Sequence, residues 1–337
     1  MKKKWDQSKL ESVNVCPYCS CVLRNLAHKN IEDWSFNVAP GLWSYYQCND
    51  CSSLYLDPRP DRDSIGEAYE NYYTHAENTN ESVIRSIRGL IKNDWLSYLL
   101  GKKIVPQLNS PRFLIKLAVS IFSKRDLPFW MDQLILSAPG KFLDMGSGSG
   151  NAVLLAKQVG WESIGIDFDP LAVEVARKKG LTAFVGSDEL LSKYQGYFDY
   201  VLCSHVLEHV HNPRQFIDRL CASVKPSGVL VITLPNSTSS VREYFGDNWR
   251  GLEAPRHLSI PSQQYLIDIF ISLGFTVDIK SDDRPETVLE SLRLQRRGCK
   301  PNLIDRFYAK YIKIKPAADM HTNDFIKLVC KKLSAES

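Results

Sequence analysis

The segment that most constrains the fold is Phe-Leu-Asp-Met-Gly-Ser-Gly-Ser-Gly, at residues 142–150. Its apolar first half predicts the end of a buried strand, and residues 151–159 have the apolar spacing of a helix. Glycine adopts backbone conformations that are unfavourable for other residues, so three glycines between a strand and a helix allow a tight turn. We therefore expect a loop that turns closely against a ligand and leads into the amino terminus of a helix.

A second signal follows the predicted helix. Ile164-Gly165-Ile166 predicts another short buried strand, and Asp167 comes directly after it. A carboxylate at the end of this strand can accept hydrogen bonds from both hydroxyls of a ribose. The glycine loop and Asp167 together predict a cofactor that contains a nucleoside.

Nicotinamide dehydrogenases have the same combination, so the position of Asp144 is important. This residue lies two positions ahead of Gly146, inside the loop. Its carboxylate would repel a pyrophosphate, whereas it could orient a cationic amino-acid group. The loop therefore favours a cofactor with an amino-acid part.

Three later segments extend the pattern: Gly-Ser-Asp at residues 186–188, Phe-Asp-Tyr-Val-Leu-Cys-Ser-His-Val-Leu-Glu-His-Val at 198–210, and Lys-Pro-Ser-Gly-Val-Leu-Val-Ile-Thr at 225–233. With Asp-x-Gly-x-Gly-x-Gly at 144–150, they resemble class I S-adenosylmethionine-dependent methyltransferases of the methyltransferase-23 type. The resemblance implies an α/β, Rossmann-like fold with a seven-stranded sheet. Strands alternate with helices from residue 140 to about 235, and residues 275–280 and 324–330 are expected to form the antiparallel pair that closes the sheet.

The resemblance also implies which residues bind S-adenosylmethionine. Asp167 would hold the ribose, and Asp188 would reach the adenine amino group. The full expected set is Asp144, Gly146, Ser147, Gly148, Gly150, Asp167, Phe168, Asp188, Ser204 and His205.

The amino-terminal region contains two Cys-x-x-Cys pairs, Cys16 with Cys19 and Cys48 with Cys51. Four thiolates satisfy a tetrahedral zinc ion and leave no coordination position open for a substrate, so a structural zinc ribbon is expected. The alternative is a set of buried or redox-active thiols. Cys21 lies near the first pair and could substitute as a ligand, but two matched pairs favour leaving it out.

Composition and the breaks between patterned segments suggest three regions: a zinc-ribbon module at residues 1–60, a helical linker or lid at 61–137, and the methyltransferase domain at 138–337. Helices are expected at residues 65–73 and 82–100 and near Ser262, with a basic insertion at 285–320. The linker is locally basic, which fits a solvated helical face, a site for a phosphorylated or nucleotide-linked substrate, or contact with an anionic membrane surface. We expect a cytoplasmic protein, because the sequence has neither a secretory signal nor a long apolar run.

The acceptor side of the site is expected after the fifth strand of the sheet. Residues 249–258 are dense in polar and aromatic groups, and among them His257 has a side chain suited to remove a proton from a hydroxyl acceptor. Glu253, four residues earlier, could orient it. The alternative is a histidine that only packs against the following helix. Arg256 could bind an anionic group of the acceptor or form a surface salt bridge.

The four cysteines ahead of this core resemble a bacterial group often associated with cell-surface polysaccharide or deoxysugar biosynthesis. Methylation of a hydroxyl on a sugar or glycan precursor is therefore the first hypothesis. A quinone-like, lipid or secondary-metabolite hydroxyl is the alternative. RNA methylation is less favoured, because a net charge of +4 is small for 337 residues and residues 203–206 lack an amino-methylation motif. The expected partner is a small-molecule or sugar-linked acceptor, and nucleic acid is not expected.

Overall fold

The structure is a computed structural model that describes residues 5–34, 36–69, 94, 97, 129–280, 286–296, 305 and 323–334. The chain divides into two compact units. Unit 1 comprises Met1–Tyr72, Leu191–Gln195 and Cys203–Ser337, and unit 2 comprises Tyr73–Leu190 and Gly196–Leu202. Each unit is described below by itself.

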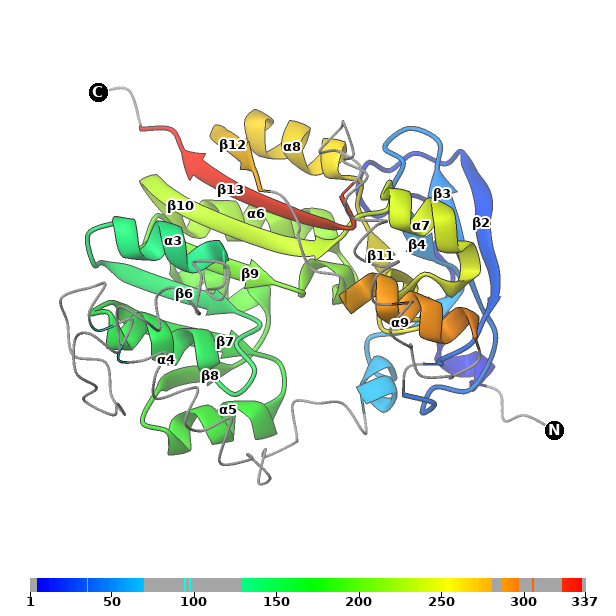
Figure 1. Cartoon of the computed structure of the whole chain (residues 1–337), viewed down its shortest axis with the longest axis horizontal. Coiled ribbons are helices and arrows are strands. Elements are labelled where there is room, and N and C mark those ends of the chain that lie inside the picture. The colour runs from blue at the N-terminus through cyan, green and yellow to red at the C-terminus, as the bar shows by residue number, and fades with distance from the viewer. Residues whose placement is uncertain are drawn as a thin grey trace. The chain divides into compact units, whose positions relative to one another are not determined.

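The largest sheet in the described residues has seven strands in the order β12-β13-β10-β9-β6-β7-β8 (Figure 1). Its strands are β6 (Lys141–Met145), β7 (Glu162–Asp167), β8 (Thr182–Val185), β9 (Phe198–Ser204), β10 (Val224–Pro235), β12 (Phe275–Ile279) and β13 (Phe325–Lys332). Strand β7 pairs in parallel with both β6 and β8, whereas β13 is antiparallel to both β10 and β12. The predicted Rossmann-like sheet and its closing antiparallel pair are confirmed.

Unit 2 contains helix α3 (Phe129–Leu136) and two βαβ crossovers, through α4 (Asn151–Gln158) and α5 (Pro170–Lys178). Figure 1 shows both crossover helices in green beside β7 and β8. The apolar faces of α4 and α5 form a small core of Val153, Val173, Ala176, Leu181 and Ala183. Helix α5 has favourable residues at its amino terminus, because the Asp169 carboxylate accepts a hydrogen bond from Leu171 N at 2.9 Å and proline occupies the first turn. This core fixes the loops that follow β6 and β7.

Unit 1 contains a second, antiparallel sheet in the order β11-β4-β3-β2. Its strands are β2 (Arg24–Ile31), β3 (Trp43–Cys48), β4 (Leu54–Leu56) and β11 (Ser259–Ile260), while β1 (Leu10–Glu11) pairs separately with β5 (Arg59–Pro60). Strand β11 therefore reaches the cysteine-bearing strands from far along the chain. We call residues 5–60 the cysteine module.

The cysteine module shares its apolar core with later parts of unit 1. Trp43, Tyr45 and Leu56 are buried in one cluster with Trp249 and Leu252. Three short strands have too little apolar area to form a core alone, so they pack against the later segments. The predicted boundaries at residues 60 and 137 stay predictions, but the packing of the module does not end at residue 60.

The other helices of unit 1 are α6 (Pro213–Ser223), α7 (Ser240–Phe245), α8 (Gln263–Ser272) and α9 (Glu286–Gln295). The short 3₁₀ turns of unit 1 are η1 (Gln7–Lys9), η2 (Ile65–Tyr69), η6 (Leu207–His209), η7 (Gly246–Asn248) and η8 (Arg250–Leu252), while η5 (Asp188–Lys193) has residues in both units. Helix α8 begins as predicted, and the Ser262 hydroxyl caps it by accepting from Tyr265 N at 3.2 Å. Helix α9 occupies part of the predicted insertion at 285–320.

Much of the predicted linker lies outside the described residues. Only η2 is described from the helix expected at 65–73, and only residues 94 and 97, both helical, from the one expected at 82–100. The three interpretations of its basic charge therefore stay predictions. Within the part of the chain that the structure describes, no helix combines the length and the apolarity needed to cross a membrane.

Candidate functional site

The glycine loop of unit 2 has the tight turn that its sequence predicts. Gly146 N and Ser147 N both donate to Ile166 O, at 2.8 and 3.2 Å, which ties the loop to the end of β7. Gly148 has a φ of 50°, and a Cβ added there would meet no atom within 4 Å. The backbone therefore borders open space at Gly148, as a loop that receives a ligand requires.

Glycine is required at position 150 for a different reason, which is packing. Its φ is 81°, and an added Cβ would lie 2.6 Å from a Leu181 side-chain carbon. The loop therefore needs glycine at this position so that α4 can begin against the core of unit 2. This requirement comes from packing, and the predicted cofactor contact of Gly150 stays a prediction.

Asp167 is positioned by the same loop. It is 6% exposed, and its carboxylate accepts hydrogen bonds from Gly148 N at 2.7 Å and Asp169 N at 2.9 Å. Burial nevertheless raises the pKa of Asp167 above its usual value. A carboxylate held in this way has lone pairs left for hydroxyl donors.

Asp144 lies at the end of β6 and is also buried. Burial, with a smaller contribution from the charge of Asp167, raises the pKa of Asp144 to about 7. A cationic group bound nearby would stabilise the ionised form. The interpretation that Asp144 orients a cationic amino-acid group is therefore consistent with its surroundings.

The remaining predicted cofactor residues divide between the two units. In unit 2, the Ser147 hydroxyl is buried without a hydrogen-bond partner among the described residues, Phe168 is 61% exposed, and Asp188 begins η5. Ser204 and His205 lie in unit 1, and His205 N donates to Thr233 O at 2.8 Å. The loop, Asp144 and Asp167 form one described cluster, and the cofactor roles of all the predicted residues stay predictions.

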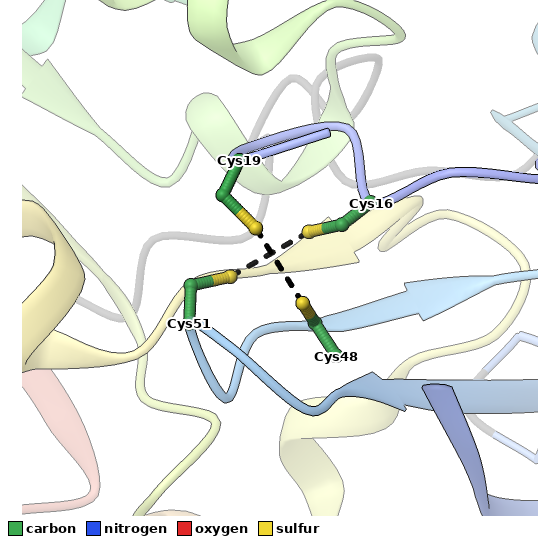
Figure 2. Close-up of side chains that lie close together, drawn as sticks. All are labelled: Cys16, Cys19, Cys48 and Cys51. Carbon is green, nitrogen blue, oxygen red and sulfur yellow. Dashed lines mark hydrogen bonds between the residues drawn. The ribbon is translucent and has the colours of Figure 1, made fainter. Parts of the chain in front are cut away.

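The four predicted cysteine ligands converge in the cysteine module (Figure 2). The Sγ atoms of Cys16 and Cys51 are 3.5 Å apart, as are those of Cys19 and Cys48. Four sulfurs bound to one zinc ion at about 2.3 Å would lie roughly 3.8 Å from one another, so this arrangement fits the ion. Cys21 is not part of this cluster, and its Sγ lies 3.7 Å from Leu23 O.

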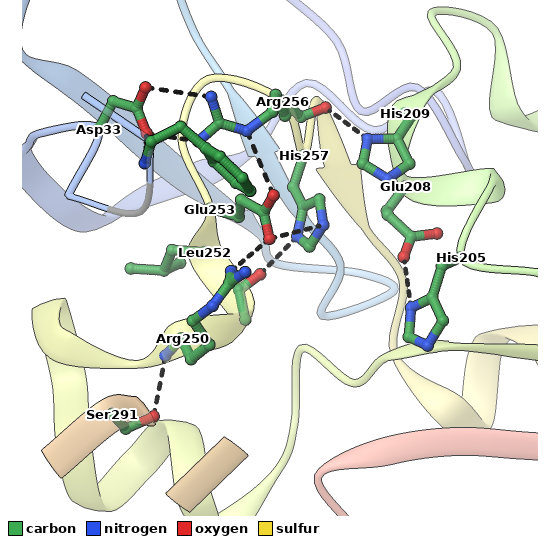
Figure 3. A network of polar contacts seen from close by, with 12 residues as sticks. Asp33, His205, Glu208, His209, Arg250, Leu252, Glu253, Arg256, His257 and Ser291 are labelled. Carbon is green, nitrogen blue, oxygen red and sulfur yellow. Dashed lines mark hydrogen bonds and ion pairs between the residues drawn. The ribbon is translucent and has the colours of Figure 1, made fainter. Parts of the chain in front are cut away.

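A buried polar network in unit 1 contains His257 and Glu253 (Figure 3). His257 is 6% exposed, and its Nδ1 lies 2.7 Å from Gly251 O. Because a carbonyl oxygen only accepts, Nδ1 carries the proton and Nε2 keeps its lone pair. Burial lowers the pKa of His257 to about 4, so its imidazole is neutral at pH 7.

Glu253 is oriented mainly by two arginines. It forms ion pairs with Arg250 and, at 3.2 Å, with Arg256, whereas its Oε2 is 3.9 Å from His257 Nε2. Burial works against ionisation, but the neighbouring cations hold the pKa of Glu253 below its usual value. The close contact that orients His257 thus comes from Gly251, which the sequence did not indicate, and the catalytic roles of His257 and Glu253 stay predictions.

Glu208 and His209 lie beside His257. Glu208 is fully buried; its Oε1 is 3.2 Å from His205 Nδ1, and its Oε2 has no hydrogen-bond partner among the described residues. The centroids of the His209 and His257 rings are 4.8 Å apart. A carboxylate oxygen of Glu208 and one ring nitrogen each of His209 and His257 all lie within 4.8 Å of one another. One carboxylate and two imidazoles could exchange protons with a bound molecule or approach a cation. The structure thus assembles a group of titratable residues larger than the predicted pair.

Both predicted roles of Arg256 were wrong. Its side chain is fully buried, forms an ion pair with Asp33 and donates to Ala68 O at 3.1 Å. It is available neither to an acceptor anion nor at the surface. Asp33 was missed because no local pattern marks a partner that is separated from Arg256 by 223 positions.

Comparison with known proteins agrees with the sheet and the loop. Residues 123–279 match the family model described as a methyltransferase domain. The match covers slightly less than half of the chain. It supports the expected methyltransferase fold and enzyme class.

The curated relatives are similar over part of the chain only. The mitochondrial ubiquinone biosynthesis O-methyltransferase of Schizosaccharomyces pombe is 28% identical over 156 residues, 44% of this chain and 53% of that protein. The ubiquinone biosynthesis O-methyltransferase of Xanthomonas campestris is 36% identical over 112 residues, 31% of this chain and 46% of that protein. The chain spans about half the length of the curated relatives it matches. A solved S-adenosylmethionine-dependent methyltransferase from Archaeoglobus fulgidus is 24% identical, with a TM-score of 0.43 over 66% of this chain and 95% of that one.

Proposed function

We propose that this protein transfers the methyl group of S-adenosylmethionine to a hydroxyl on a quinone-like or phenolic ring. The observation that carries the donor half is the pairing of buried Asp167 with the open space at Gly148. Asp167 would accept the ribose hydroxyls, and Asp144 would face the cationic amino group of the methionine part. Asp188 would contact the adenine.

His257 is the proposed proton acceptor. As the acceptor oxygen attacks the methyl carbon, a carbon–oxygen bond forms, the carbon–sulfur bond breaks, and the hydroxyl proton passes to Nε2 of His257. The products are a methyl ether and S-adenosylhomocysteine. Glu208 and His209 lie beside the imidazole and would share the proton.

The chemistry of His257 favours a phenolic acceptor over a sugar hydroxyl. An imidazole with a pKa of about 4 is a weak base. A phenol, with a pKa of about 10 as in tyrosine, releases its proton more readily than an aliphatic alcohol. The names of the partial relatives, ubiquinone biosynthesis O-methyltransferases, also support the ring hydroxyl that was the sequence alternative. They lend no support to the polysaccharide hypothesis.

We also propose that Cys16, Cys19, Cys48 and Cys51 bind one structural zinc ion. Four sulfurs would complete its coordination, so the ion would stabilise the cysteine module and take no part in methyl transfer.

A competition assay tests the proposed acceptor. The protein is incubated with S-adenosylmethionine labelled in its methyl group and an equimolar mixture of an alkylated catechol and a nucleotide-linked sugar. Mass spectrometry then identifies which product carries the label. We expect label on the catechol oxygen; label on the sugar alone would refute the phenolic acceptor and restore the polysaccharide hypothesis.

A further inference from the structure

Residues 250–258, which we call the acceptor loop, are attached to the cysteine module by buried polar contacts. The strongest attachment is Asp33, which follows β2 and has a side chain only 1% exposed. Its carboxylate accepts hydrogen bonds from Phe36 N, Val38 N and Ala39 N at 3.0 to 3.2 Å. The same carboxylate forms the ion pair with Arg256. Asp33 is thus fixed by its own module and in turn fixes the loop.

Tyr45 provides a second attachment. This residue lies on β3 and is fully buried, and its hydroxyl is 2.6 Å from Leu252 O and 2.7 Å from His257 O. It therefore contacts the loop on both sides of Glu253. Leu56 N also donates to Leu258 O at 2.9 Å, next to the pairing of β4 with β11.

These contacts lie next to His257 in the chain. Arg256 directly precedes His257 in the chain, and Figure 3 shows Asp33, Arg256 and Glu253 joined in one continuous network. Buried ion pairs contribute little net stability compared with apolar packing, but their fixed geometry defines one arrangement of the groups that they join. A loop held in this way presents the His257 imidazole in one orientation.

We propose that Asp33 and Tyr45 are positioning residues for the acceptor chemistry. The cysteine module, which lies entirely outside the matched methyltransferase segment, thereby positions the acceptor chemistry and is more than an attached metal-binding domain. The inference rests on the proposed function, because it assumes that His257 acts on the acceptor.

The test compares Asp33→Asn and Tyr45→Phe with the control Asp57→Asn. Asp57 also belongs to the cysteine module and forms an ion pair with Arg24 at 2.8 Å, but its hydrogen bonds, with Val13 N and Ser44 O, stay within the module. Hydrogen exchange is measured on peptides covering the acceptor loop and, for comparison, on peptides covering residues 143–152. Methyl-transfer kinetics and S-adenosylmethionine affinity are measured on the same preparations.

We expect Asp33→Asn and Tyr45→Phe to raise exchange in the acceptor loop by about tenfold or more, and exchange at 143–152 to stay unchanged. Turnover should fall by about tenfold or more while donor affinity stays within about twofold, because the donor is held by other residues. Asp57→Asn should alter neither the loop exchange nor the turnover. If Asp33→Asn does not fold, Tyr45→Phe, which loses a single hydroxyl, decides the question.

Two results would overturn the proposal. Unchanged loop exchange in the variants would show that these contacts do not hold the loop, and normal turnover with a loosened loop would show that its position does not matter. A wild-type protein that methylates none of the acceptors offered would refute the proposed function together with this inference. The failures are distinguishable, because only the last one appears in the unaltered protein.

Discussion

At the scale of single residues, the proposed donor site contains two acids whose environments differ. Asp167 is buried but accepts two backbone hydrogen bonds, whereas the pKa of Asp144 is raised further, to about 7. The sequence predicted Asp167 from its place at the end of a strand and Asp144 from its place two positions ahead of Gly146. It did not predict their protonation, because burial and the distance between two carboxylates are properties of the folded chain.

The raised pKa of Asp144 predicts proton release on cofactor binding. The free protein holds a proton near pH 7 that a nearby cationic amino group would displace, so binding should release a substantial fraction of about one proton. Calorimetric titrations in buffers of different ionisation enthalpy measure this number, and Asp144→Asn should bring it close to zero. Equal proton release by wild type and Asp144→Asn would contradict the assignment.

The same residue predicts a pH dependence of stability. The pKa of Asp144 is about 7 in the folded chain, and its ordinary value, expected in the unfolded chain, is 3.8. At a pH between these two values, the folded chain therefore binds more protons than the unfolded chain. Stability in the absence of cofactor should therefore fall as the pH rises through this window. Asp144→Asn should flatten the fall, which melting temperatures measured from pH 5 to 8 would reveal. A slope unchanged by the substitution would place its origin elsewhere.

His257 provides the most specific prediction about chemistry. If its Nε2 accepts the hydroxyl proton, His257→Gln should lower turnover by about 10² to 10⁴ and leave donor affinity nearly unchanged. His211→Gln is a suitable control, because His211 is another histidine of unit 1, partly buried, and its Nε2 lies 3.1 Å from Pro60 O. Turnover that is near normal in His257→Gln, or equally reduced in both variants, would remove the catalytic role.

At the scale of secondary-structure elements, local patterns predicted most of what the structure describes. Helices α4 and α8 and strands β12 and β13 form close to where their apolar spacing placed them, because each buries one face on a neighbour nearby. Strand β11 and the pairing of Asp33 with Arg256 were not predicted. Both depend on contacts between segments about 200 positions apart, for which a single sequence has no local signal.

The cysteine cluster gives the prediction at this scale. Cys48→Ser should lose bound zinc, because three sulfurs and a weak hydroxyl ligand do not complete the tetrahedral site. Cys21→Ser should keep the metal, since Cys21 lies outside the cluster. Metal analysis gives the zinc content per chain, and donor affinity should be retained in both variants. Zinc missing from wild-type protein prepared without chelators, or kept by Cys48→Ser, would argue against the four-cysteine site.

At the scale of the whole molecule, the methyltransferase match and the compact units do not coincide. The matched segment, residues 123–279, takes residues from both units but contains neither the cysteine module nor β13. The partial relatives likewise cover less than half of the chain. The matched segment therefore contains both the glycine loop and the acceptor loop, whereas the cysteine module that contacts the acceptor loop lies outside it.

The central claim is that the glycine loop and Asp167 bind S-adenosylmethionine, and a calorimetric titration tests it most directly. Wild-type protein should bind one molecule per chain, and Asp167→Ala should weaken the affinity more than about tenfold, a loss above roughly 1.4 kcal/mol. The control Glu174→Gln removes an exposed partner of Lys178 on α5 and should bind like wild type. Absence of binding by the wild type, or equal affinity in wild type and Asp167→Ala, would contradict the account.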